Sequence, residues 1–367
     1  MKKYFILAAA AALTLASCAK VENFSKVNDD QHVIGFSNYA PKALAKADTT
    51  NYVASTSLVN DADFDVWAWY VANDQSFDGS NGTKYFSNWY TVSYKGDGAG
   101  TSGENNAYPD GARYWPTGDT PDKLSFFAYY PSNAGTITAP AAGLGAFNFT
   151  AENADSTQVD FMVADVVKDQ VYGNTNASPT HKGTVNLTFK HQLTKVQVKF
   201  KTIPAIVKDT LTDITVTDAK FYNINNTGTL TASYDGSATS TAWSSVSGTE
   251  TYDIAYPKAA LDSVANTVAN KNLFLMVPQT MVEKAGTNPQ YIEVSWKVVT
   301  DGVTTNNTRK IYLDECVTTD GGDTQANIDW VKNHFVTYVI TIAPNQILFT
   351  GDASNWEDEE IGYYRIF

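Results

Sequence analysis

The stretch TVNLTFKHQLTKVQVKFK, residues 184–201, decides the fold class of this chain. Apolar side chains occupy every second position of residues 185–189 and again of residues 196–200. Residues 191–194, between the two runs, have the composition of a turn. Because successive side chains of a β-strand point to opposite faces, the pattern predicts a hairpin whose two strands each have one buried and one solvated face.

Short segments of this kind recur along the chain and are separated by Gly, Asn, Asp, Ser and Thr. The other candidate strands are residues 64–71, 124–130, 159–166, 214–222, 273–277, 291–299, 335–342 and 346–349. No long stretch after residue 18 has helical periodicity, and strands do not alternate with helices as they do in parallel α/β folds. The sequence therefore predicts an all-β protein built from antiparallel β-sandwiches.

The 367 residues are enough for two ordinary domains, each with its own core. Pro204 follows the second strand of the quoted stretch, and we place the domain boundary there. This gives an N-terminal β-sandwich over residues 32–204 and a C-terminal β-sandwich over residues 205–350. Residues 18–31 form the predicted tether, and residues 351–367 form a C-terminal appendage.

The charge balance and the scarcity of metal-binding residues exclude several classes of function. The chain has 26 Lys and Arg against 39 Asp and Glu, a net charge of −13, so it lacks the basic footprint that nucleic-acid binding needs. Two cysteines and four histidines exclude a Cys/His zinc site. None of the histidines stands in a catalytic or metal-binding motif. We therefore predict no enzymatic activity, no metal and no cofactor.

The first residues predict export and lipid attachment. Two lysines precede an apolar run over residues 4–15, which is too short to span a bilayer as a helix. Residues 15–18, LASC, resemble the bacterial lipobox, in which cleavage falls before the cysteine and the cysteine is acylated. The expectation is a signal peptide over residues 1–17 and a lipid anchor on Cys18 in the outer membrane.

Aromatic side chains allow two interpretations. Trp67 and Trp69 share one face of a predicted strand, and Trp115 lies in a separate segment. Such rings either pack in a sandwich core or form an exposed platform that stacks on sugars. We favour the core. The second interpretation describes a surface lipoprotein that binds glycans and does not polymerise.

Several segments in a fixed order connect the chain to a known family. They are YWP at 114–116, KLSFFAYYP at 123–131, VDFMVA at 159–164, LTFKHQLTKV at 187–196, LMVPQ at 275–279, YVITI at 338–342 and NW at 355–356. Together they resemble the fimbrillin family of Bacteroidetes lipoprotein pilins. The resemblance implies two tandem transthyretin-like β-sandwich domains. It also implies a structural subunit of a fimbrium at the cell surface, with a role in adhesion.

The resemblance further implies how subunits join. Such pilins are cut after a basic residue beyond the first strand, which opens a groove that the C-terminal strand of the next subunit fills. The first strand is predicted at residues 32–40, with Ile34 and Phe36 on the groove side. Lys42 and Lys46 are the candidate cleavage positions, although both lysines are alternatively linker charges. No arginine, the residue cut in the best-known members, lies in this region.

The end of the chain predicts the donated strand. Four acidic residues precede an apolar tail in which Ile361, Tyr363 and Phe367 share one strand face. Tyr364 and Ile366 share the other face. Other pilin subunits are then the expected partners, with a host or bacterial surface ligand as a further one. The alternatives are a final strand packed on its own domain, or an anchor or tip subunit of the pilus.

Overall fold

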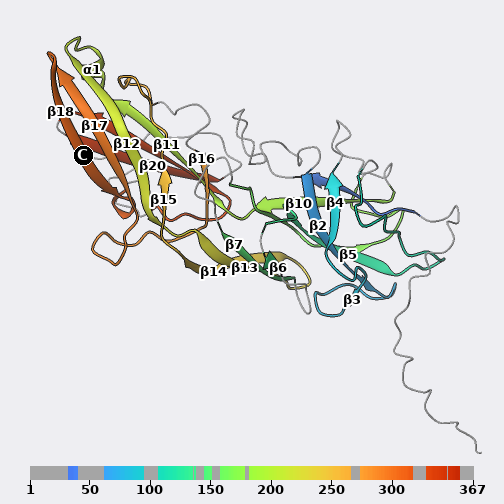
Figure 1. Ribbon diagram of the computed structural model, residues 1–367. Helices are drawn as coiled ribbons and strands as arrows, with labels where there is room; N and C mark the ends of the chain where they lie inside the picture. Colours follow the sequence, from blue (N-terminus) through green and yellow to red (C-terminus); the bar gives the residue numbers. More distant parts are fainter. Residues whose placement is uncertain are drawn as a thin grey trace, which may run out of the picture.

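The computed structural model describes residues 32–39, 62–94, 106–134, 136–137, 144–150, 158–177, 182–265, 273–316, 328–344 and 346–355. The prediction of an all-β protein is confirmed, because the described residues form four β-sheets (Figure 1). Helical structure in these ranges is limited to the short helix α1, Pro204–Val207, and the 3-10 turn η1, Leu313–Glu315. None of the helices in the described part is long and apolar enough to cross a membrane.

The largest sheet has eight strands and carries the first strand of the fold at its edge. The strands are β1 (Gly35–Tyr39), β2 (Ala62–Val71), β3 (Thr83–Lys84), β4 (Tyr90–Tyr94), β5 (Lys123–Tyr130), β8 (Met162–Ala164), β9 (Val167–Gln170) and β10 (Thr184–His191). Their order is β1-β10-β8-β5-β2-β3. In addition, β4 pairs with β2, and β9 pairs with β5. One face of this sheet carries an apolar core that includes Phe64, Phe126 and Leu187.

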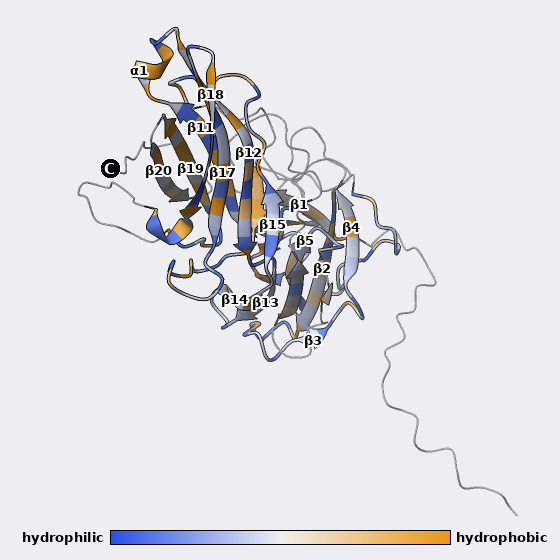
Figure 2. Ribbon diagram, turned by 60° about the vertical axis from the view of Figure 1, so that its left-hand side comes forward, coloured by the Kyte–Doolittle hydropathy of each residue, from blue (hydrophilic) through white to orange (hydrophobic). Residues whose placement is uncertain are grey.

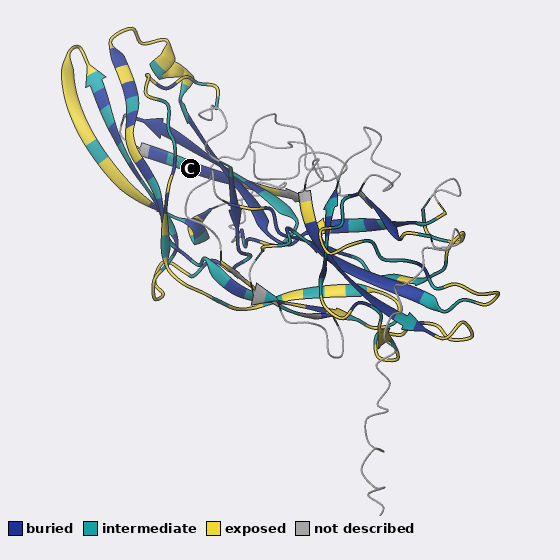
Figure 3. Cartoon of the chain, turned by 45° about the vertical axis from the view of Figure 1, so that its right-hand side comes forward, coloured by how far each residue is buried: buried dark blue, intermediate teal, exposed yellow. Residues whose placement is uncertain are grey.

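Two four-stranded sheets enclose a second core. One has the order β16-β11-β19-β20, with β16 (Leu273–Met276), β11 (Thr194–Thr202), β19 (His334–Ala343) and β20 (Gln346–Asn355). The other has the order β15-β12-β17-β18, with β15 (Glu250–Asp253), β12 (Thr212–Ile224), β17 (Tyr291–Thr300) and β18 (Val303–Tyr312). Every second side chain of β17 is buried between them, and this alternation of hydropathy is visible in Figure 2. β18, at the edge, is exposed along most of its length (Figure 3).

The fourth sheet has the order β14-β13-β7-β6 and joins distant parts of the chain. Its strands are β14 (Thr239–Ser247), β13 (Thr227–Tyr234), β7 (Gly145–Thr150) and β6 (Thr136–Ile137). Two of them precede residue 204 and two follow it. Leu230 of β13 packs in a third core with Trp67 and Phe127, which lie on the second face of the large sheet. The segment 227–247 therefore pairs with and packs against strands that come much earlier in the sequence.

The stretch at residues 184–201 forms two strands, but the predicted hairpin is wrong. β10 pairs with β1 and β8, whereas β11 pairs with β16 and β19 in a different sheet. The residues between them pass the chain from one sheet to the next (Figure 1). Alternation fixes which side chains share a face but contains no information about which strand lies alongside. The pairs β1–β10 and β11–β19 are also parallel, in contrast to the antiparallel pairing predicted throughout.

The predicted solvated face of the second strand is also wrong. Lys195, Gln197 and Lys199 have exposed fractions of only 4%, 9% and 9%. β11 lies in the interior of its sheet, and the ammonium group of Lys195 sits 4.7 Å from the ring centroid of Phe335. A long aliphatic stem lets a lysine pack against apolar neighbours, so lysines at alternate positions do not guarantee a solvent-facing side.

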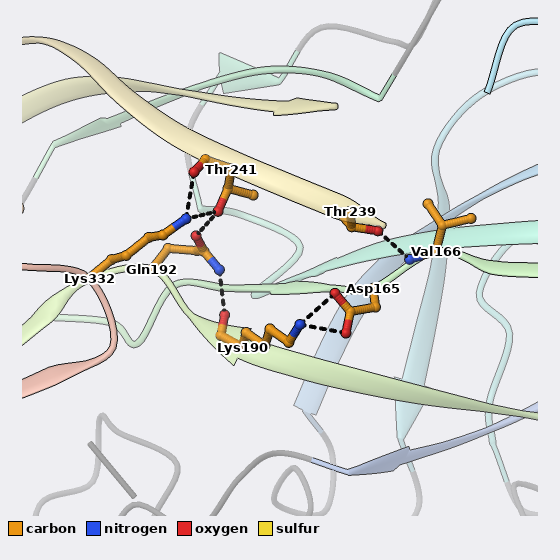
Figure 4. Close-up of polar contacts among 7 residues, drawn as sticks. All are labelled: Asp165, Val166, Lys190, Gln192, Thr239, Thr241 and Lys332. Carbon is orange, nitrogen blue, oxygen red and sulfur yellow. Dashed lines mark hydrogen bonds and ion pairs between the residues drawn. The ribbon is translucent and has the colours of Figure 1, made fainter. Parts of the chain in front are cut away.

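Polar contacts tie β14 to the junction between β10 and β11 (Figure 4). The side-chain oxygen of Gln192 accepts a hydrogen bond from Thr241 Oγ1 at 2.7 Å, and the main-chain oxygen of Gln192 accepts one from Trp243 Nε1 at 2.7 Å. Lys332, which precedes β19, donates to the main-chain oxygen of Thr241. Burial, with the charge of Lys190, lowers the pKa of Lys332. These contacts connect the sheet that contains β14 to the junction between β10 and β11 and to the segment before β19.

Candidate functional site: the slot of the first strand

The first strand lies at the edge of the large sheet and pairs, among the described strands, with β10. The two run parallel, in a register that places Gly35 opposite Thr184 and Tyr39 opposite Thr188. The main-chain nitrogen of Gly35 also donates to the oxygen of Gly183 at 2.9 Å. β1 occupies a position within residues 32–40, where the sequence predicts a first strand.

The side chains of this strand fill the core of the sheet. Ile34 and Phe36 both have an exposed fraction of 0%. The Phe36 ring makes edge-to-face contacts with Phe126, at 5.6 Å between centroids, and with Phe64, at 6.3 Å. Edge-to-face aromatic pairs add stabilisation to the burial of apolar area. Loss of β1 would therefore open an apolar slot lined by these rings.

The start of the strand is held on its outer side by main-chain bonds to the segment 106–115. Val33 and Tyr114 form an isolated antiparallel bridge. Around it, the Ile34 nitrogen donates to Arg113 O at 2.8 Å, and the Trp115 nitrogen donates to His32 O at 2.9 Å. β1 is therefore enclosed on both edges, by β10 on one and by this segment on the other.

Further along the strand, side chains replace the main chain as hydrogen-bond donors. The Tyr108 hydroxyl donates to Ile34 O at 2.8 Å, and Asn106 Nδ2 donates to Phe36 O at 2.7 Å. The outer row of carbonyl oxygens is thus satisfied without a second paired strand at these positions. Neither residue could be identified from the sequence, because asparagine and tyrosine are ordinary in a loop and their partners lie 70 and 74 positions earlier.

Gly183 permits the main chain of Val33, at the start of the slot, to approach closely. A Cβ atom at Gly183 would lie 2.9 Å from the carbonyl oxygen of Val33, closer than side-chain carbons approach in real structures. Trp115 Nε1 donates to Gly183 O at 3.0 Å, and the His32 ring stacks on Tyr172 at 3.6 Å. Any larger residue at position 183 would push the strand out of register.

The remaining residues of the predicted assembly site lie outside the described part of the chain. These are Cys18, Lys42, Lys46, Ile361, Tyr363, Tyr364, Ile366 and Phe367. Trp67, Trp69 and Trp115 are all buried, with exposed fractions of 0%, 6% and 3%, so the core interpretation of these rings is confirmed. They form no platform for sugars.

The described part contains buried titratable side chains that are hydrogen-bonded to one another or to neighbouring hydroxyl groups. His191 Nδ1 lies 2.9 Å from the Asp160 carboxylate, and both side chains are fully buried at the end of β10. Asp65 is buried as well, where it accepts a bond from Thr91 Oγ1 at 2.7 Å, and burial raises its pKa. Among the described residues, no group of three or more His, Cys, Asp or Glu could hold a metal ion.

An edge strand that fills a core slot, in a chain made of β-sheets, is a feature of proteins that pair with other chains through strands. The family model of fimbrillin-like proteins matches residues 34–356. The chain therefore belongs to the fimbrillin-like family, which is not an enzyme family. This membership supports a role as a pilus subunit that assembles with other pilin subunits in a cell-surface appendage.

Solved structures that are similar to the chain are distant in sequence. A fimbrial protein from Bacteroides vulgatus is 18% identical, with a TM-score of 0.55 over 89% of this chain and 100% of that chain. The tip fimbrial protein Mfa3 from Porphyromonas gingivalis, with a C-terminal truncation, is 10% identical, with a TM-score of 0.38 over 88% of this chain and 99% of that chain. No curated protein sequence matches. At these identities, the first of the two structures supports the fold and nothing finer.

Proposed function

We propose that the chain is a structural fimbrial subunit that polymerises by donor-strand exchange. In this scheme a protease cuts after Lys42 or Lys46, and the fragment that contains β1 leaves the slot. A strand from the next subunit then takes its place. The observation that carries the proposal is the position of β1, an edge strand whose Ile34 and Phe36 fill a core slot.

The proposed occupant of the emptied slot is the segment 361–367 of a neighbouring subunit. The slot receives apolar side chains from two residues that are two positions apart, Ile34 and Phe36. Ile361 and Tyr363 have this spacing, and so do Tyr364 and Ile366. Each subunit would then donate one strand and accept one, and a head-to-tail contact that does not close on itself builds a filament.

The proposal includes export as a lipoprotein. Signal cleavage after residue 17 and acylation of Cys18 would hold the precursor at the outer membrane until the cut releases it. Two tandem domains, over residues 32–204 and 205–350, are the proposed domain organisation, in which segment 227–247 of the second packs against strands of the first. The form with β1 in its slot corresponds to the uncut precursor. An anchor subunit would keep this form permanently.

The proposal is tested by controlled cleavage of the purified chain. A specific protease site placed between Lys42 and Ala43 allows the cut to be made after the protein has folded. We expect negative-stain electron microscopy to show filaments after the cut and monomers before it, because the slot is occupied until β1 can leave. An excess of a synthetic peptide of residues 356–367 should shorten the filaments by capping free slots.

Two results would contradict the proposal. One is filament growth from the uncut chain at the same rate. The other is a cut chain that releases its N-terminal fragment and remains monomeric at high concentration. In the second case, an unchanged far-UV circular dichroism spectrum would exclude unfolding as the reason.

A further inference from the structure

The outer edge of the slot contains two side chains, Asn106 and Tyr108, that donate hydrogen bonds to main-chain oxygens of β1. We infer that Asn106 and Tyr108 are positioning residues that hold the main chain of whichever strand fills the slot, a donated strand as well as β1. The inference rests on the proposed function only for the identity of the incoming strand. Asn106 and Tyr108 are here called the strand clamp.

The geometry of the clamp follows the spacing of a β-strand. The carbonyls that accept from Tyr108 and Asn106 belong to Ile34 and Phe36, at 2.8 Å and 2.7 Å. Residues two positions apart direct their carbonyl groups to the same side, here away from β10. The bond from the Ile34 nitrogen to Arg113 O lies on the same side. The clamp therefore continues, with side chains, a row of bonds that the main chain begins.

The clamp is held by contacts that do not involve β1. The Tyr108 ring stacks on Tyr90 at 5.9 Å with an interplanar angle of 14°, and the Tyr90 hydroxyl donates to Gly111 O. Asn106 also forms a side-chain hydrogen bond to Tyr108. Burial raises the pKa of Tyr108, so its hydroxyl keeps its proton and remains a donor at physiological pH. Donors held in this way lose little freedom when a strand arrives.

One acceptor of the clamp is not used by β1. Asn106 is 9% exposed, and its Oδ1 atom has no hydrogen-bond partner. A buried acceptor without a partner is unfavourable. A carboxamide beside a strand edge can donate to a carbonyl and accept from an N–H group at once. Asn106 Oδ1 can therefore accept a bond from an outward N–H group of the strand that fills the slot.

The clamp and the core pockets select different properties of the strand. Both clamp bonds go to main-chain oxygens, which every residue has, so the clamp selects direction and register. The pockets that receive Ile34 and Phe36 select the side chains. A subunit can therefore accept strands of different sequence as long as their apolar residues have the same spacing.

The test measures strand release from the cut full chain described above. A fluorescent peptide of residues 31–41 is exchanged into the slot of the cut protein, and its dissociation rate is measured in wild type, Tyr108→Phe and Asn106→Leu. Each substitution removes one bond to a buried carbonyl, so we expect release to be about tenfold faster in each variant. The matched control is Tyr234→Phe, which removes a tyrosine hydroxyl that donates to Gly236 O and not to the strand. Its rate should stay within about twofold of wild type.

A backbone substitution in the peptide separates the clamp from a general structural role. Replacing the amide between Phe36 and Ser37 with an ester weakens the Phe36 carbonyl as an acceptor. The ester also removes the Ser37 N–H group, which faces β10, and this loss is common to all variants. The change should therefore speed release from wild type and from Tyr108→Phe more than from Asn106→Leu, whose bond to the Phe36 carbonyl is already gone. Such coupling between two groups is the signature of direct contact.

The outcomes distinguish the inference from the function on which it rests. Equal release rates in wild type and both clamp variants would overturn the inference, as would an ester effect of the same size in Asn106→Leu and in wild type. If the peptide of residues 31–41 exchanges and the peptide of residues 356–367 does not, the donor assignment fails while the clamp stands. Melting temperatures of the uncut variants control for misfolding.

Discussion

We expect deletion of residues 361–367 to abolish polymerisation of the cut chain and to leave a folded monomer. The tail supplies the proposed incoming strand, so its loss removes the main-chain bonds and apolar contacts that join one subunit to the next. Losing only about 3 kcal/mol of these contacts lowers association about 100-fold, which is enough to eliminate filaments at ordinary concentrations. Filament mass after ultracentrifugation, with the melting temperature of the monomer, gives the measurement.

The control for this deletion keeps the length and changes the acidic segment. Replacing Glu357, Glu359 and Glu360 with glutamine removes charge next to the tail without touching its apolar residues. This variant should polymerise as wild type does. Normal filaments from the truncated chain would instead show that residues 361–367 are not the donated strand.

We expect the Phe36→Ala substitution to destabilise the uncut chain strongly and to have no effect on the stability of the filament. The Phe36 ring is fully buried between Phe64 and Phe126, so its loss should lower the free energy of unfolding by about 3–5 kcal/mol. Once the strand has been cut away, residue 36 leaves with it. Filaments from the variant should then disassemble at the same denaturant concentration as those from wild type.

Ser37→Ala is the matched control in the same strand. Its side chain lies on the opposite face and donates to Asn186 Oδ1 at a long 3.3 Å, so removing it should cost less than about 1 kcal/mol. Denaturant unfolding of the uncut chains measures both effects. Filaments of Phe36→Ala that are as weakened as the precursor would mean that β1 remains in the polymer.

Strands with alternating apolar residues were predictable from the sequence, and strands without them were not. Four strands, β12, β16, β17 and β19, overlap their predicted ranges closely. Each has either a buried face that alternates with a more exposed face, or a continuous run of apolar residues. β14 and β18 consist mainly of polar residues and are exposed over much of their length. Their strand conformation depends on pairing with β13 and β17, which local sequence does not encode.

In the site, too, some features follow from the local sequence pattern, whereas others depend on contacts between residues far apart in the sequence. The burial of Ile34 and Phe36 follows from an alternation that the sequence displays. The roles of Asn106 and Tyr108 depend on contacts across 70 and 74 positions of the sequence. The hairpin prediction failed for the same reason, since the neighbours of β10 and β11 come from remote segments.

The most direct test of strand removal is the N-terminal residue of the protein sheared from the surface of intact cells. A chain that begins at Ala43 or Ala47 would have lost β1, as donor-strand polymerisation requires. A chain that begins at an acylated Cys18 would still have β1 in its slot, and would contradict a role as a polymerising subunit.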